Sequence, residues 1–174
     1  SAGMGGAGIL ASETSLFCGS GLVKLTTDKS NVKAALSRNP EVMTAGINMG
    51  NDINVQIDIK DQDVILYGPG IYKTMATDTI FNEILKNSNN CKLIFDAGAL
   101  HIMASVPHIT KKLDQSILMT PHPGEAAILL KKSINEIQKN RTLAAENISK
   151  TYKASIVILK GMETVIYSAK DNES

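Results

Sequence analysis

The chain has 174 residues, 43% hydrophobic and 20% charged, with a formal net charge of +1, which suits one soluble domain with a substantial core. A charge near zero and an aromatic content of 4% without Trp argue against the electrostatic and stacking contacts of nucleic-acid binding. No apolar run approaches the roughly 20 residues that a membrane-spanning helix needs. We therefore expect no nucleic-acid or membrane partner and a cytoplasmic location.

Helical and strand patterns alternate along the chain. Apolar residues at helical spacing, with glycine or proline stops, predict helices, and short apolar runs predict strands. The expected helices are 8–18, 31–38, 75–86, 99–104, 124–131 and 134–152. The expected strands are 22–27, 42–47, 64–67, 92–95, 117–119, 154–159 and 164–168, the last two joined as a hairpin. The polar residues 48–63 are ambiguous.

This alternation predicts a mostly parallel sheet with helices on both faces. The continuous apolar run 64–67 is typical of a strand buried on both faces. No linker or repeat divides the chain, so we expect one α/β domain over residues 1–174. A glycine-rich opening without a strand before it, and an end just after a strand, lead us to expect that this domain is incomplete at both ends.

The two cysteines, Cys18 and Cys91, lack the spacing of a metal site. We expect them to be small core or boundary residues and not a disulfide. We assign no residue of the chain to a metal.

Polar and glycine-rich segments follow four of the expected strands. They are Gly68-Pro69-Gly70, Asp96-Ala97-Gly98, Thr120-Pro121-His122 and Lys160-Gly161. Because parallel strands end at one edge of a sheet, we expect these segments to line one cleft. Every strand–helix connection needs turn residues, so the glycines have a simpler explanation. That explanation does not account for Asp96 and His122.

The segment 120–125, Thr-Pro-His-Pro-Gly-Glu, is the most specific local pattern. Its two prolines close a strand, and Pro123 suits the first turn of the next helix. His122 then projects from the carboxyl end of a strand, where ligands bind in open α/β sheets. The residues alone leave open a stiff turn with an incidental histidine.

Two further segments are candidates for binding phosphate. Residues 3–8 are a glycine-rich approach to a helix, whose first N–H groups and dipole favour an anion. Close backbone packing would require the same glycines. Residues 160–164 place a cation and a flexible turn at a strand end, where a nucleotide contact and a solvated hairpin turn both stay open.

Several motifs together resemble the NAD(P)H-hydrate dehydratases. They are residues 3–11, Gly19-Ser20-Gly21, Arg38-Asn39-Pro40-Glu41, Gly68-Pro69-Gly70, Asp96-Ala97-Gly98-Ala99-Leu100, residues 120–125 and residues 159–166, in the family's order. The resemblance covers nearly the whole chain and implies a ribokinase-like, three-layer αβα fold. It implies a carbon–oxygen lyase that uses ADP or ATP, with Mg²⁺, to dehydrate hydrated NADH or NADPH in metabolite repair.

The resemblance also implies roles for individual residues. The positions that match the site for the hydrated dinucleotide are Ala7, Gly70 and His122. The positions that match the adenine-nucleotide segment are Lys160, Gly161, Met162, Glu163 and Thr164. The family's general base, an aspartate in a Gly-x-Gly-Asp motif, has no counterpart in this sequence. We expect it beyond Ser174, and we expect the 174 residues alone to be inactive.

Two departures from the family pattern leave other functions open. Gly98 stands where the family has an aspartate, and Tyr72 where it has a glycine. One alternative is a ribokinase-like kinase for a vitamin precursor or a sugar, for which phosphate transfer ends the reaction. Another is a non-catalytic nucleotide-binding relative. The preference for ADP or ATP and assembly into a homo-oligomer also stay open.

Overall fold

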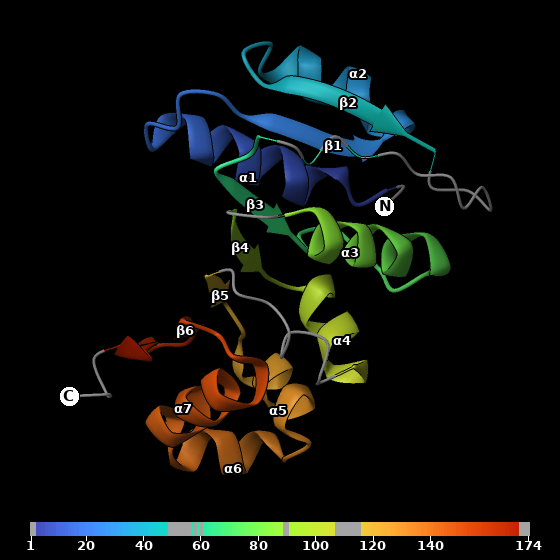
Figure 1. Cartoon of the computed structure of the whole chain (residues 1–174). Coiled ribbons are helices and arrows are strands. Elements are labelled where there is room, and N and C mark those ends of the chain that lie inside the picture. Colours follow the sequence, from blue (N-terminus) through green and yellow to red (C-terminus); the bar gives the residue numbers. More distant parts are fainter. Residues whose placement is uncertain are drawn as a thin grey trace. The chain divides into compact units, whose positions relative to one another are not determined.

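The computed structural model describes residues 3–48, 57, 59, 61–88, 91–106 and 116–170, in which helices and strands mostly alternate as far as Met119, before three consecutive helices and a final strand pair (Figure 1). The helices are α1 (Gly5–Phe17), α2 (Lys29–Arg38), α3 (Met75–Asn87), α4 (Gly98–Ser105), α5 (Pro123–Leu130), α6 (Ile134–Lys139) and α7 (Arg141–Tyr152). The strands are β1 (Lys24–Asp28), β2 (Met43–Ile47), β3 (Val64–Tyr67), β4 (Lys92–Phe95), β5 (Ile117–Met119), β6 (Ile156–Leu159) and β7 (Val165–Ser168). Two compact units are present, the first formed by Ser1–Asp58 with Pro69–Glu83 and the second by Ile59–Gly68 with Ile84–Ser174.

The first unit contains a parallel pair of strands, β1 and β2, against which α2 packs. α2 begins at Lys29, earlier than the predicted 31–38, because the Asp28 side chain caps it and accepts a hydrogen bond of 3.0 Å from the N–H of Ser30. Arg38, at the end of α2, donates from Nε to both carboxylate oxygens of Glu13 at 2.7 and 2.9 Å. Glu13 is buried in α1, so this ion pair joins α1 to α2.

The second unit contains a five-stranded sheet in the order β3-β4-β5-β6-β7. The first four strands are parallel, and β7 runs antiparallel to β6 as the predicted hairpin partner. α7 packs against β6 and β7, and α5 packs against α4, α6 and α7. The core side chains with no exposed surface include Leu93, Phe95, Met119, Val157 and Leu159. These residues recur at every second position of the central strands, which holds the strands in register.

Two elements differ from the sequence-based predictions in more than their bounds. The helix predicted over 134–152 is two helices, because Asn140 adopts a non-helical conformation and its side chain caps α7 with a 3.0 Å hydrogen bond from Leu143 N. The prediction that residues 64–67 are buried on both faces is also wrong. β3 is the edge strand of its sheet, and Val64 and Leu66 are 48% and 42% exposed. A continuous apolar run therefore does not distinguish an edge strand from a central one.

Candidate functional site at the strand ends

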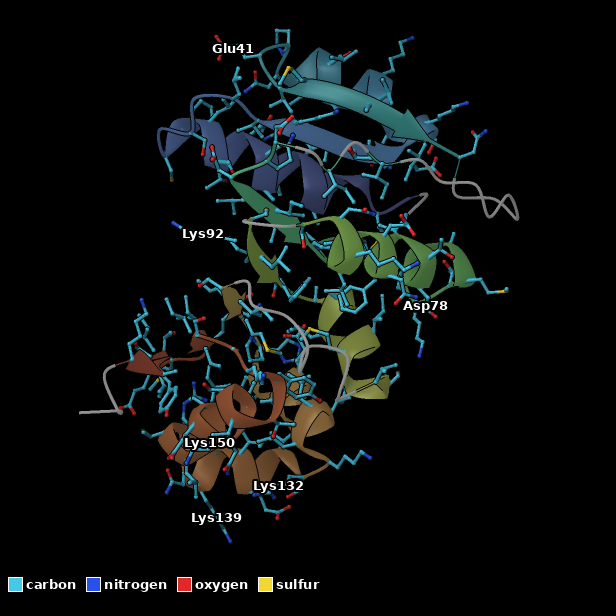
Figure 2. All side chains as sticks on the ribbon, in the orientation of Figure 1. Glu41, Asp78, Lys92, Lys132, Lys139 and Lys150 are labelled. Atoms are coloured by element: carbon cyan, nitrogen blue, oxygen red, sulfur yellow. The ribbon has the colours of Figure 1, made fainter. Side chains whose placement is uncertain are left out.

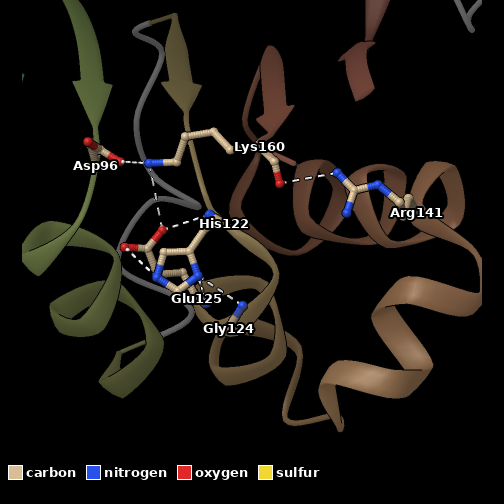
Figure 3. A network of polar contacts seen from close by, with 6 residues as sticks. All are labelled: Asp96, His122, Gly124, Glu125, Arg141 and Lys160. Carbon is tan, nitrogen blue, oxygen red and sulfur yellow. Dashed lines mark hydrogen bonds and ion pairs between the residues drawn. The ribbon is translucent and has the colours of Figure 1, made fainter. Parts of the chain in front are cut away.

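The carboxyl ends of β4, β5 and β6 lie at one edge of the second unit's sheet, as predicted. Backbone hydrogen bonds continue past the strands into the turns that follow them. Thr120 N donates to Phe95 O at 3.1 Å, and Lys160 N donates to Pro121 O at 2.8 Å. The three turns are thus held side by side, and they bring together Asp96, His122 and Lys160 (Figure 3).

Lys160 lies between two carboxylates (Figure 3). Its Nζ atom is 2.7 Å from Asp96 Oδ1 and 4.0 Å from Glu125 Oε2. The Glu125 side chain is only 6% exposed, whereas those of Asp96 and Lys160 are 27% and 42% exposed. A buried carboxylate requires hydrogen bonds or a nearby cation, and Glu125 has both. The result is a mixed-charge group at the strand ends, with its cation partly open to solvent.

His122 caps helix α5. Its Nδ1 accepts hydrogen bonds from Gly124 N at 3.0 Å and Glu125 N at 3.3 Å. The backbone N–H of His122 in turn donates to Glu125 Oε2 at 2.7 Å. This reciprocal arrangement is a capping box. Since Nδ1 accepts these bonds, Nε2 is the ring nitrogen that carries a hydrogen, and it lies 3.5 Å from Glu125 Oε1. His122 therefore has a structural role in the turn, and its side chain is still 56% exposed.

Arg141, the first residue of α7, binds the turn of residues 160–164. Its Nη2 donates to Leu159 O at 2.8 Å and Lys160 O at 3.2 Å, and its Nε donates to Glu163 O at 3.2 Å. Gly161 leaves room for this side chain, because a Cβ atom there would lie 2.7 Å from Nη2. Met162, at the tip of the turn, is fully exposed.

The connection from β4 to α4 is strained at Ala97. Its φ of 46° and ψ of −118° lie in a region that glycine normally occupies. The turn is closed by a 3.1 Å hydrogen bond from Ala99 N to Asp96 O. Gly68 lies against the same carbonyl, so that any Cβ at Gly68 would clash with it. Asp96 is therefore held at the edge of the sheet by strained but closely packed backbone.

Ala7 and Gly70 lie together in the first unit. Gly70 has a φ of 70°, and a Cβ on it would clash with Met4 O and lie 3.6 Å from Ala7 Cβ. Ala7 is exposed and Gly70 half-buried. Within residues 3–8, Gly8 packs close to a neighbouring side chain, whereas a Cβ at Gly6 would meet nothing within 4 Å. Close packing thus explains only some of these glycines.

Cys18 and Cys91 are free thiols, as predicted. Cys91 is buried, and burial raises the pKa of its thiol, whereas Cys18 is exposed. In the described ranges, no three His, Cys, Asp or Glu residues lie close enough to hold a metal ion. The helices within those ranges are also too short or too polar to cross a membrane.

The sequence analysis predicted no functional role for Glu125 or Arg141, although both organise the site. Glu125 had a usable signal, because a residue that caps a helix followed three positions later by Glu is the pattern of a capping box. Arg141 had none, since it contacts residues 18 to 22 positions away.

The fold is that of a ribokinase-like α/β protein. The structure of a ribokinase-like superfamily protein from Enterococcus faecalis has a TM-score of 0.76 and 24% identity. The match covers 95% of this chain and 56% of the Enterococcus chain. The ADP/ATP-dependent NAD(P)H-hydrate dehydratase from Bacillus subtilis, co-crystallized with ATP/Mg²⁺ and soaked with CoA, has a TM-score of 0.82 and 26% identity. That match covers 98% of this chain and 60% of the Bacillus chain. The predicted three-layer, mostly parallel, ribokinase-like fold class is confirmed.

Sequence comparison identifies the family. Residues 1–173 match the family model described as NAD(P)H-hydrate dehydratase, and the chain therefore belongs to that family. It is 30% identical to the bifunctional NAD(P)H-hydrate repair enzyme of Coxiella burnetii, over 94% of this chain and 32% of that protein. It is 29% identical to the ADP-dependent (S)-NAD(P)H-hydrate dehydratase of Neisseria meningitidis, over 97% of this chain and 55% of that protein. The chain thus spans from 32% to 55% of the length of these relatives.

Proposed function

We propose that the whole protein dehydrates hydrated NADH or NADPH to the working cofactor in a reaction that uses ADP or ATP. The observation that supports it most directly is the family match over residues 1–173. The relatives named as dehydratases agree with it. Because hydrated NAD(P)H and adenine nucleotides are small intracellular molecules, the proposal also places the protein in the cytoplasm.

The geometry of the second unit supports an adenine nucleotide on the turn of residues 160–164. Lys160 supplies an ammonium group that can pair with phosphate oxygens. Its side chain is 42% exposed, so an anion can reach it. In this proposal Gly161, Met162, Glu163 and Thr164 form the rest of the nucleotide contact. Backbone held close to a ligand suits a turn that contains glycine.

We assign the hydrated dinucleotide to His122, Gly70 and Ala7. For His122, the supporting observation is the ring itself: Nδ1 is used by the helix cap, and Nε2, which lies 3.5 Å from Glu125 Oε1, belongs to a side chain that is 56% exposed. For Gly70 and Ala7, it is their close contact within the first unit, where Gly70 admits no side chain. A hydrogen-bond donor and a bare backbone surface are suitable contacts for a polar dinucleotide.

Magnesium is compatible with the residues at the strand ends. Mg²⁺ in nucleotide sites is held by one or two carboxylates together with phosphate oxygens and water. The described ranges hold no cluster of three such ligands, but Asp96 and Glu125 supply two carboxylates beside the same lysine, and they are the residues that would hold the ion together with nucleotide phosphates. When bound with nucleotide, the ion would neutralise phosphate charge.

The test is a reconstitution with the full-length protein. Hydrated NADH would be incubated with ATP or ADP and Mg²⁺, while NADH absorbance and released phosphate are followed together. The proposal predicts that NADH is restored only when a nucleotide is present. A stable phosphorylated product without NADH would identify a kinase instead. Nucleotide binding without any turnover would identify a non-catalytic relative.

A further inference from the structure

The turn of residues 160–164 receives few hydrogen bonds from the sheet. The last paired residues of the hairpin are Leu159 and Val165, so the five residues between them lie outside the ladder. Within the turn, Thr164 Oγ1 donates to Gly161 O at 3.0 Å. One such bond leaves most of this exposed loop to be ordered by other contacts.

Arg141 supplies those contacts from the start of α7. One guanidinium group binds the carbonyls of Leu159, Lys160 and Glu163, on both sides of the turn. Its Nη1 also donates to Gln138 Oε1 at 2.7 Å, which fixes the orientation of the group. The planar fork of arginine is suited to several acceptors at fixed angles, whereas a lysine ammonium is not.

We propose that Arg141 is a positioning residue for nucleotide binding, which holds the turn and thereby sets where Lys160 presents its ammonium group. Lys160 is held at both ends: its carbonyl by Arg141 and its ammonium by Asp96 (Figure 3). A change at Arg141 therefore moves the backbone from which the Lys160 side chain starts. The inference rests on the proposed function, because it takes the turn to be the nucleotide contact.

The charge of Arg141 adds to this effect. Among the described residues, no carboxylate forms an ion pair with its guanidinium group, which binds neutral oxygens only. Its positive charge is therefore not cancelled locally and favours an anion bound at the neighbouring turn. Arg141→Lys keeps the charge and loses the fork, whereas Arg141→Gln loses both. Comparing the two variants separates positioning from charge.

The experiment measures ATP and ADP affinity of the full-length protein by calorimetry, and the KM values for nucleotide and for hydrated NADH. Lys139→Gln is the matched control, because it removes a positive charge two positions away, on a side chain that points outward from α6 (Figure 2). We expect Arg141→Lys to weaken ATP binding about tenfold or more, since several hydrogen bonds to the turn are lost. The KM for hydrated NADH and the control should change less than about twofold.

Gly161→Ala provides a second test that leaves Arg141 in place. The added methyl group would lie 2.7 Å from Nη2, so the guanidinium group must move. We expect the same selective loss of nucleotide affinity, and a double variant no worse than the stronger single one, because both act through one contact. Gly161 is exposed, so this variant serves if Arg141→Lys does not fold.

The outcomes separate this inference from the proposed function. The role of Arg141 would be overturned, even in an active enzyme, by unchanged nucleotide affinity in both Arg141→Lys and Gly161→Ala. An equal loss of affinity for nucleotide and for hydrated NADH would also overturn it. A wild-type protein that binds ATP but restores no NADH would overturn the dehydratase function alone, and the affinities would still decide the role of Arg141. A wild-type protein that binds neither ATP nor ADP would overturn both.

Discussion

Lys160 reaches from the end of β6 to the end of β4, where its ammonium group lies 2.7 Å from the carboxylate of Asp96. The two residues are 64 positions apart in the sequence. This ion pair crosses the end of β5, where His122 caps α5. A lysine, two carboxylates and a histidine therefore lie together at one sheet edge. Substitutions of these residues test the site.

Lys160→Ala should act on the nucleotide. Removing the ammonium group deletes a charge-assisted contact to phosphate, and we expect the KM for ATP or ADP to rise about tenfold or more. The KM for hydrated NADH should rise less. Steady-state kinetics with each ligand varied in turn measures the difference. Lys150→Ala is the control, because this exposed lysine pairs with Glu146 on the outer surface of α7. Equal increases for both ligands would contradict the assignment of the turn to the nucleotide.

His122 should respond differently to alanine and to asparagine. His122→Ala removes the cap of α5 and is expected to cost about 0.5–2 kcal/mol of unfolding free energy. His122→Asn keeps a capping side chain, so its stability should stay near that of the wild type. Both variants lose Nε2–H and should weaken hydrated-NADH binding. Urea denaturation and calorimetry measure the two effects. If asparagine restores the binding as well as the stability, the ring is only a cap.

Ala97→Gly should stabilise the protein. Ala97 has a φ of 46°, and glycine adopts that conformation without strain. The larger entropy of glycine in the unfolded chain offsets part of the gain, and we expect a net increase of about 1 kcal/mol. Urea denaturation checks it. Ala104→Gly, the same substitution inside α4, should instead lose about 1 kcal/mol. A loss of stability in both variants would show that Ala97 is not strained.

Because of Tyr152, the stability of the second unit should fall as pH rises in the alkaline range. Burial raises the pKa of its hydroxyl above the ordinary value of 10.0, and the hydroxyl donates to Leu129 O at 3.0 Å. The folded protein therefore holds this proton at a pH where the unfolded chain has lost it, so stability should fall as pH rises above about 10. Tyr152→Phe should lose about 1 kcal/mol near neutral pH. It should also show a smaller fall at high pH, measured by denaturation across that range. The same slope in both proteins would exclude Tyr152 as its source.

Local sequence determined most of the secondary structure. The strands predicted at 92–95 and 117–119 coincide with β4 and β5, because apolar runs bounded by polar or turn residues depend on few neighbours. The Asp28 cap of α2 is equally local, because its side chain bonds Ser30 only two positions away. The break at Asn140 was missed, since the helical pattern continues across it, although its backbone is non-helical and its side chain caps α7.

The features of the site also fall into those that local sequence predicts and those that it does not. The sequence by itself determined which turns hold polar residues, and parallel strands guaranteed that those turns share an edge. Only the tertiary structure decided that His122 uses one ring nitrogen as a helix cap, that Lys160 pairs with Asp96, and that Arg141 holds the neighbouring turn. The physical reason is that ion pairs and hydrogen bonds between distant residues depend on distances of a few ångströms. Strand register and packing set those distances, and no local pattern records them.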